Sequence, residues 1–450
     1  MKMDANAKAS SSASKRSHQR TGGGEPKAEP TPSKTHQKIV NPTWRSVQRQ
    51  RTSGQPNQCV RAEVSNRLPL AHGESLTGGM RDLEKRLRRY CQLYDQCYSS
   101  DGRLLACSDD YGRLSIFNLD DCLAVPCDAD PDKFTAPGPA LQIDVGEERG
   151  AASTGGYRSY PIYSLASTER HLICGTAAGE LLGYEWELCE GGAAAPNASF
   201  AVSLRAEAGG AVLSEINSMA LLENDERLVA AGGDCRLHVV SLETGQIERS
   251  LSGHSEYVHA VAWCVEESSS AAGGPPVVAS AGEDGQLLVW DLRTGEAQRK
   301  LVPAQLQQCQ RSEKGNWLGC LAVDGQWLVC GGGPRLGLFH LSSMSLALLL
   351  GPAVDIDYHV VSTLQQKILA GGSDSSVYQF DYDDGKPVNA VSVAPTRFVY
   401  SIRSNEGAAK NHITTACGAG SQVAVFINLG YKSSALDVFA PPPGKQKSIS

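Results

Sequence analysis

The sequence predicts an all-β protein, folded as a β-propeller of seven blades. Three observations predict this fold class: short apolar strands bounded by Gly- and Asp-containing turns, the return of one strand–turn–strand pattern, and the spacing of its copies. Each copy carries an apolar residue near the end of its last strand, and these residues are Phe117, Tyr184, Val240, Trp290, Phe339, Phe380 and Phe426. They stand 41 to 67 residues apart, and the later intervals approach the roughly 40–45 residues of a four-stranded blade.

The fourth copy is the most complete, and it resembles a WD repeat. His254 follows Gly253 and stands 36 residues before Trp290. Its strands are predicted over Tyr257–Cys264, Val277–Ala281 and Leu287–Trp290. The tripeptide Glu283-Asp284-Gly285 is expected to form a tight turn, because Asp tolerates turn conformations and Gly accepts a positive φ.

Four polar or amphipathic side chains of this copy match a network that WD repeats generally contain. They are His254, Ser280, Asp284 and Trp290. A buried indole N–H needs an acceptor, and a histidine can link two buried partners. His254 and Asp284 would also suit a catalytic dyad. We favour the structural network, because the spacing is that of a WD repeat.

The predicted boundaries divide the chain into four parts. They are a disordered basic tail at 1–75, a short amphipathic helix at 76–89, the propeller at 90–440 and a disordered tail at 441–450. Two insertions rich in Pro, Ala and Gly, at 122–155 and 189–210, lengthen the early intervals and are expected to be surface loops.

The charge of the chain is unevenly spread. Residues 1–67 contain 13 Lys and Arg but four Asp and Glu, a net charge of +9; since the whole chain carries −7, the rest carries −16. With few large apolar residues, the tail cannot offset the entropy of ordering. A basic arm on an acidic body is typical of proteins that work near nucleic acid. We expect contact with RNA to be mostly indirect, with the tail as the candidate for direct contact; the alternative is a dispensable extension.

The predicted helix carries Met80, Leu83 and Leu87 at helical spacing. Its cluster Lys85-Arg86-Leu87-Arg88-Arg89 could act as a nuclear-localisation signal. We favour a solvated helix face that packs against the propeller.

Composition also bears on the compartment. The sequence has no apolar run near the roughly 20 residues that span a bilayer, so no membrane contact is expected. It contains 14 cysteines without a C-x-x-C pair, several of them within predicted strands: Cys107, Cys174, Cys264, Cys320, Cys330 and Cys417. Reduced core cysteines are typical of the cytosol or nucleus.

The sequence lacks the common catalytic motifs, namely a phosphate-binding loop, a G-x-S-x-G elbow and H-E-x-x-H. The run Gly331-Gly332-Gly333-Pro334 is expected to be a turn inside a blade. Asp381, Asp383 and Asp384 surround Tyr382 and could supply a carboxylate pair, although a solvated loop is favoured. We therefore expect no enzyme, no catalytic residue, no cofactor, no metal site and no small-molecule substrate.

One segment goes beyond generic WD character. Residues Gly315–Asp324 and Trp327–Pro334 resemble the fifth blade of the THO complex subunit 6 family, and the ending Val425–Tyr431 does so too. The likeness covers about 90–439. It implies a non-catalytic scaffold of the transcription–export complex, acting in mRNA processing, splicing and nuclear mRNA export. It also implies docking on coiled-coil THO subunits in a multi-subunit complex of the nucleus, with nuclear speckles as the candidate compartment.

Two tryptophans of that segment, Trp317 and Trp327, lie outside the usual WD positions. Each could contact a partner or belong to the core. We favour the core, because apolar strand-like runs flank both.

A second function class rests on the end of the fourth copy. Trp290 is followed by Asp291 and Arg293, and Val278–Arg293 resembles the W-D-x-R box of substrate receptors in cullin-RING ubiquitin ligases. In that case Asp291 and Arg293 would contact the ligase adaptor. The alternative is an ordinary strand end.

We predict that deleting residues 1–70 leaves the propeller folded and soluble, because this segment has no core to contribute. Salt-sensitive association with RNA-rich material should weaken with the loss of the basic arm. Limited proteolysis of the full chain tests the first point. Resistance to cleavage up to about residue 75 would overturn it.

Overall fold

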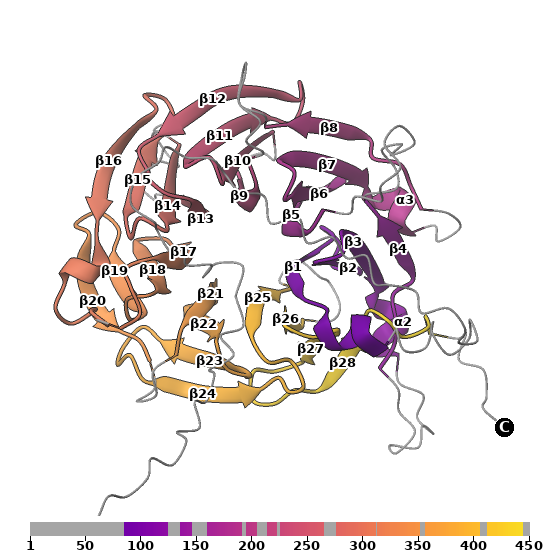
Figure 1. Ribbon diagram of the computed structural model, residues 1–450. Helices are drawn as coiled ribbons and strands as arrows, with labels where there is room; N and C mark the ends of the chain where they lie inside the picture. The colour runs from indigo at the N-terminus through magenta and orange to yellow at the C-terminus, as the bar shows by residue number, and fades with distance from the viewer. Residues whose placement is uncertain are drawn as a thin grey trace, which may run out of the picture. The chain divides into compact units, whose positions relative to one another are not determined.

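Seven four-stranded antiparallel sheets form a ring in the computed structural model (Figure 1). The structure describes residues 85–124, 136–145, 160–190, 195–204, 214–222, 226–264, 276–311, 313–351, 356–405 and 412–443. The predicted seven-bladed propeller is confirmed. The predicted tail at 1–75, most of the predicted helix at 76–89 and residues 444–450 lie outside the described residues.

Each blade uses four consecutive strands, with the first strand of each innermost in the ring. The first blade contains β1 (Leu93–Tyr98), β2 (Leu104–Asp109), β3 (Arg113–Asn118) and β4 (Leu141–Asp144). The second contains β5 (Ile162–Ser167), β6 (His171–Thr176), β7 (Glu180–Glu185) and β8 (Phe200–Ser203). The third contains β9 (Ile216–Leu221), β10 (Arg227–Gly232), β11 (Arg236–Ser241) and β12 (Gln246–Ser252).

The remaining four blades follow the same order. The fourth contains β13 (Val258–Cys264), β14 (Val277–Gly282), β15 (Leu287–Asp291) and β16 (Glu296–Leu301). The fifth contains β17 (Leu318–Asp324), β18 (Trp327–Gly332), β19 (Gly337–His340) and β20 (Ser345–Leu349). The sixth contains β21 (Tyr358–Leu364), β22 (Lys367–Gly372), β23 (Ser376–Asp381) and β24 (Pro387–Ser392). The seventh contains β25 (Val399–Ser404), β26 (Thr414–Gly418), β27 (Gln422–Phe426) and β28 (Ser434–Asp437).

The core lies between the blades. The described residues form seven apolar clusters, and each cluster joins two neighbouring blades. The seven repeated apolar residues, Phe117, Tyr184, Val240, Trp290, Phe339, Phe380 and Phe426, all lie in third strands and are at most 1% exposed. Each belongs to the cluster that its own blade shares with the preceding one. These residues therefore act as wedges between blades.

The innermost strand of every blade contains an irregularity after its first residue. The pairing register skips one residue there, in turn Tyr94, Tyr163, Asn217, His259, Gly319, His359 and Tyr400. Such bulges bend a strand and redirect the skipped residue. Aromatic contacts then join the blades: Tyr94 lies 5.1 Å from Tyr163 and 6.1 Å from Tyr400, between ring centroids.

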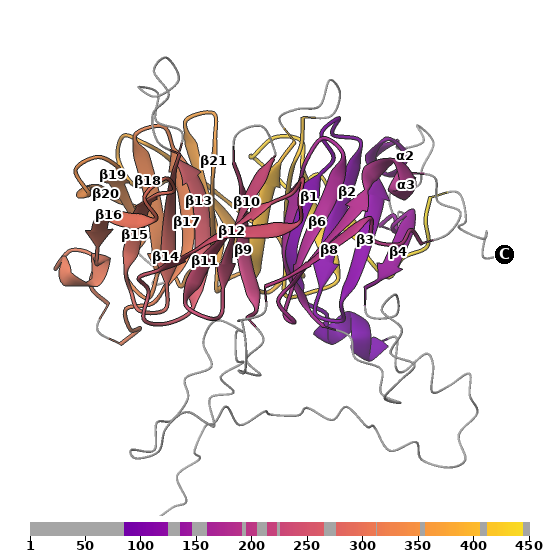
Figure 2. The same ribbon diagram turned by 90° about the horizontal axis from the view of Figure 1, so that it is seen from above.

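The sequence predicted surface loops for both early insertions, but parts of each insertion are helical or stranded. The short helices α2 (Leu119–Leu123) and α3 (Trp186–Glu190) extend into them, and β4 and β8 lie within them as the outer strands of their blades. Figure 2 shows the ring edge-on, with both helices at its outer rim. β4 alternates buried and exposed residues, a pattern too short to stand out in a segment rich in Pro and Gly.

All six cysteines predicted in strands are buried and free, as are most of the other described cysteines. Burial raises the pKa of Cys107, Cys330 and Cys417 well above its usual value, so these thiols stay neutral. They act as small apolar core residues.

The ring closes between the seventh and first blades without exchanging a strand. β28 is the outer strand of the seventh blade, and β1 packs against β25 and β26. The amide of Gln96 in β1 donates to the backbone oxygen of Thr415 at 2.9 Å. Arg88, in the helical residues 85–90, donates to Asp437 at 3.1 Å and to the backbone oxygen of Phe439 at 2.7 Å.

Asp95 ties three blades together at this closure. Its buried carboxylate accepts a hydrogen bond from the backbone N–H of Leu165 in the second blade at 2.9 Å. It accepts another from the Ser401 hydroxyl of the seventh blade at 2.8 Å. The half-exposed guanidinium of Arg403 lies 3.3 Å away and completes the set.

We predict that Asp95→Ala lowers the free energy of unfolding by about 1–3 kcal/mol, because it leaves buried donors of two neighbouring blades unsatisfied. Asp121→Ala, at an exposed position, is the matched control and should change it by less than about 0.5 kcal/mol. Chemical denaturation of both variants measures the difference. Equal free energies of unfolding for the two variants would show that Asp95 does not stabilise the closure of the ring.

Candidate functional site

The four predicted residues of the fourth blade lie in one chain of hydrogen bonds. The Trp290 indole N–H donates to the Ser280 hydroxyl at 2.8 Å, and that hydroxyl lies 2.8 Å from His254 Nε2. His254 Nδ1 lies 3.1 Å from each oxygen of the Asp284 carboxylate. With the His254 proton on Nδ1, Ser280 can accept from Trp290 and donate to Nε2 while Nδ1 donates to Asp284.

The close packing around this chain explains the neighbouring glycine. A Cβ on Gly253 would lie 2.7 Å from the Trp290 ring, so no larger residue fits before His254. Asp284 also accepts from the backbone N–H of Ser255 at 3.0 Å. Burial alone would raise the pKa of Asp284, but the hydrogen bonds from His254 and Ser255 outweigh it and hold that pKa below its ordinary value.

This geometry does not suit a catalytic dyad. The side chains of His254 and Asp284 are 1% and 3% exposed, so a substrate could not reach them. The sequence reasoning missed a second, partly buried constellation: His238 lies 2.9 Å from the Ser250 hydroxyl and 3.0 Å from Asp234. Asp234 lies in the turn between β10 and β11, and nothing in the repeated pattern predicts that His238 would join it.

At the end of β15 in the fourth blade, Asp291 is buried and Arg293 is exposed. The buried carboxylate of Asp291 accepts the backbone N–H of Arg293 at 2.8 Å and the amide of Gln298 at 3.1 Å, so it holds the turn after β15. The side chain of Arg293 is 61% exposed, 3.4 Å from Asp291. A partner could therefore reach Arg293 but not Asp291.

Trp317 and Trp327 lie at opposite ends of β17, and hence on opposite faces of the ring. Both are half-buried. Trp317 stacks on His359 with centroids 6.3 Å apart, and it belongs to none of the apolar clusters formed by the described residues. Trp327 packs against the cluster between the fifth and sixth blades. Trp327 therefore contacts the edge of the core and Trp317 stacks outside the clusters; the core role expected for both stays a prediction.

The glycines beside Trp317 offer backbone oxygens to a buried arginine, Arg311, which sequence reasoning missed. The turn expected over Gly331–Pro334 begins only after Gly332, because Gly331 and Gly332 are the last residues of β18. A Cβ on Gly333 would lie 2.3 Å from the backbone oxygen of Gly315. Arg311, whose side chain is 5% exposed, donates to the backbone oxygens of Gly333 at 2.7 Å and Ile356 at 2.6 Å, and it pairs with Asp357. Arg311 therefore clamps the fifth blade to the sixth.

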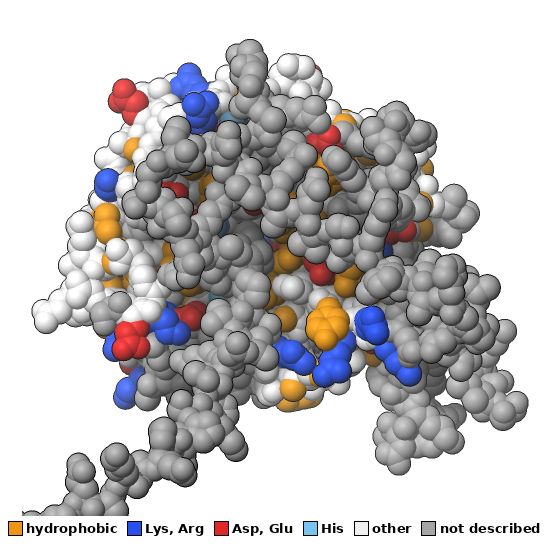
Figure 3. All heavy atoms as spheres, viewed as in Figure 1, with side chains coloured by type: hydrophobic (Ala, Val, Ile, Leu, Met, Phe, Trp, Pro, Cys, Tyr) orange, Lys and Arg blue, Asp and Glu red, His pale blue; other side chains and the backbone are white. Residues whose placement is uncertain are grey.

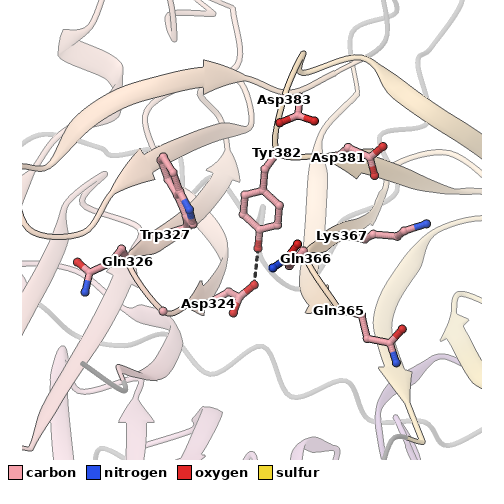
Figure 4. Close-up of a pocket in the computed structure, with 10 residues that line it drawn as sticks. Asp324, Gln326, Trp327, Gln365, Gln366, Lys367, Asp381, Tyr382 and Asp383 are labelled. Atoms are coloured by element: carbon pink, nitrogen blue, oxygen red, sulfur yellow. Dashed lines mark hydrogen bonds between the residues drawn. The ribbon is translucent and has the colours of Figure 1, made fainter. Parts of the chain in front are cut away.

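On the opposite face, Trp327 forms one wall of a pocket of about 650 Å³ between the fifth and sixth blades (Figure 4). Asp381, Tyr382 and Asp383 also line it, so the acidic segment expected to be a plain solvated loop borders a cavity. The Tyr382 hydroxyl donates to Asp324 at 2.7 Å. Burial and this hydrogen bond raise the pKa of Tyr382, which keeps the phenol protonated.

A basic patch marks one face of the ring. Lys85, Arg86 and Arg89 are exposed in the helical residues 85–90, next to the exposed side chain of Tyr90. Figure 3 shows Lys and Arg side chains gathered on this face, near the place where Figure 1 draws that segment. Arg88 is tied to the end of the seventh blade, as described above.

The described residues contain no group of three His, Cys, Asp or Glu arranged to hold a metal ion. No helix among them is long and apolar enough to cross a membrane.

We predict that His254→Ala and Asp284→Ala each lower the free energy of unfolding by about 1–3 kcal/mol, because each leaves a buried partner unpaired. The double variant should lose less than the sum of the two, since both remove one interaction. The contribution of Asp284 should be complete above its ordinary pKa of 3.8 and decline as the pH falls through its lowered pKa. Thermal melts identical to wild type in both variants would refute the network's structural role.

Comparison with known proteins places the chain in a family. Residues 245–291 match the model of the WD domain, G-beta repeat. The chain is 32% identical over 353 residues to THO complex subunit 6 of Homo sapiens, covering 78% of this chain and 93% of that protein. It is 29% identical over 353 residues to the homologue of Danio rerio, covering 77% and 97%. The protein of Arabidopsis thaliana is 28% identical over 194 residues, covering 42% and 47%. This chain therefore belongs to the THO complex subunit 6 family.

Proposed function

We propose that this chain is a non-catalytic scaffold subunit of the THO complex, which acts within the transcription–export complex. The observation that carries the proposal is its 32% identity over 353 residues to a protein named THO complex subunit 6. Its role would be to support mRNA processing, splicing and nuclear mRNA export through contacts with other proteins. It would work in the nucleus, with nuclear speckles as the candidate compartment.

The physical character of the propeller supports a scaffold role. Its blades are joined by apolar wedges and by buried polar ties such as Arg311 and Asp95, which make a rigid ring. A rigid ring presents loops in fixed positions, which suits protein contacts. The His254–Asp284 pair is enclosed, and a structural role needs no cofactor, metal or small-molecule substrate.

The partners we propose are the coiled-coil subunits of the THO complex. In the described part of the chain, Trp317 on one face and Trp327 on the other are half-buried, so part of each ring is open to solvent. Interfaces often centre on tryptophan. Contact with RNA would be mostly indirect. The basic tail and the exposed Lys85, Arg86 and Arg89 are the candidates for direct contact, and the same cluster is the candidate nuclear-localisation signal.

A second function rests on Arg293. Its 61% exposed side chain follows the Trp290-Asp291 pair, as the adaptor-binding box of a cullin-RING ubiquitin-ligase receptor requires. Under this alternative the chain recruits substrates to a ligase, and Arg293 contacts the adaptor. The buried Asp291 would act by holding the turn.

We predict that a pull-down from nuclear extract, with and without RNase, recovers the coiled-coil THO subunits in both cases. Trp317→Ala and Trp327→Ala should each lower the free energy of unfolding by about 1–3 kcal/mol, less than the loss of a fully buried tryptophan would.

Thermal melts and the same pull-down are then compared for each variant. A variant that melts like wild type but no longer recovers the THO subunits would place the interface at that residue. Recovery of a ligase adaptor and cullin in their place, sensitive to Arg293→Ala, would favour the alternative.

A further inference from the structure

The pocket between the fifth and sixth blades is built from two neighbouring hairpins and the end of a third strand. Its lining residues are Asp324, Gly325, Gln326, Trp327, Gln365, Gln366, Lys367, Asp381, Tyr382 and Asp383. The turn after β17 supplies one side, the turn after β21 another, and the end of β23 the third. Its volume of about 650 Å³ lies in the range of ligand-binding sites.

Two aromatic rings form its apolar surface. Trp327 and Tyr382 lie 6.1 Å apart between centroids, at an angle of 46°. The Trp327 ring makes a T-shaped contact with His340, with centroids 5.6 Å apart. Trp327 and Tyr382 both pack on the cluster between the blades. The rings are therefore held in place, while their half-buried state leaves part of each surface open to the pocket.

Carboxylates surround these rings. Asp324 is oriented by the Tyr382 hydroxyl at 2.7 Å, and Asp381 and Asp383 border the same opening. Lys367 is the one cation in the lining, and Figure 4 shows it directed away from Trp327. Within the described part of the chain, neither Asp381 nor Asp383 forms an ion pair. Three carboxylates against one ammonium leave the pocket with a formal charge of −2.

We propose that this pocket binds an arginine side chain presented by a basic segment of a partner protein. A guanidinium can stack on the face of Trp327 while its N–H groups donate to the carboxylates beside it. The combination of aromatic wall and negative charge matches a cation. Phosphate groups of nucleic acid would be repelled, and a neutral peptide would leave the carboxylates without a counter-charge.

Arginine fits this pocket better than lysine. Its planar head stacks on an indole and forms paired hydrogen bonds to a carboxylate, whereas an ammonium acts as a compact, strongly hydrated charge. The pocket shares Trp327 with the surface proposed to contact the THO subunits, but the peptide titration below measures arginine binding alone. Either proposal can fail while the other stands.

The test is a fluorescence-anisotropy titration of the full chain with a short labelled peptide of alternating Arg and Gly. Trp327→Leu should weaken binding by about two- to thirty-fold, the loss of one cation–π contact. Asp383→Asn should weaken it by up to about five-fold. Asp384→Asn, an exposed neighbour that does not line the pocket, is the matched control and should leave the affinity unchanged.

Lys367→Ala gives a result that misfolding cannot imitate. Removal of the one opposing charge should tighten the binding of the Arg peptide by up to about five-fold. It therefore tests the pocket even if Trp327→Leu fails to fold, which a thermal melt would reveal.

Three results would overturn the proposal. Equal weakening by Asp384→Asn and Asp383→Asn would show unspecific attraction to an acidic surface. Equal affinity for a matched Lys peptide would remove the preference for arginine. Binding of a single-stranded oligouridine that Asp383→Asn or Lys367→Ala alters would make the occupant a nucleic acid.

Discussion

The structure depends on one packing constraint: each third strand inserts an apolar side chain, aromatic in six of the seven blades, into the seam with the preceding blade. Burial of one such side chain contributes about 1.5–3 kcal/mol. A ring needs as many seams as blades, so the last seam must form between segments far apart in the sequence. There Phe117 of the first blade packs beside Cys417 and Val425 of the seventh. Asp95 adds a buried polar tie at the same place.

Sequence patterns predicted the residues that recur in every blade, but they missed the residues that act at a single seam between two blades. The seven wedges were found because they recur at similar intervals among apolar strands. The outer strands were not, since β12 is almost wholly exposed and carries no apolar alternation. Arg311 and Asp95 have no repeated counterpart in the sequence pattern. Their partners lie on other blades, so their roles depend on tertiary contacts that no local pattern encodes.

The two faces of the fifth blade carry different chemistry. Near Trp317, glycines allow loops to approach closely, and their carbonyl oxygens bind Arg311 from the same chain. Near Trp327, aromatic rings and carboxylates leave a pocket. Sequence reasoning singled out both tryptophans and the strand-like run between them, but it could not separate their roles, because their neighbours His359 and Tyr382 come from the next blade.

The proposed role of this propeller as a structural subunit of the THO complex is tested most directly by the mass of an assembly. The purified full chain is mixed with purified THO subunits that lack it, and the mass of the product is measured. The account predicts a stable complex whose mass rises by a whole number of copies of this chain, unchanged by RNase. Masses equal to those of the separate components, at concentrations where both remain folded, would contradict it.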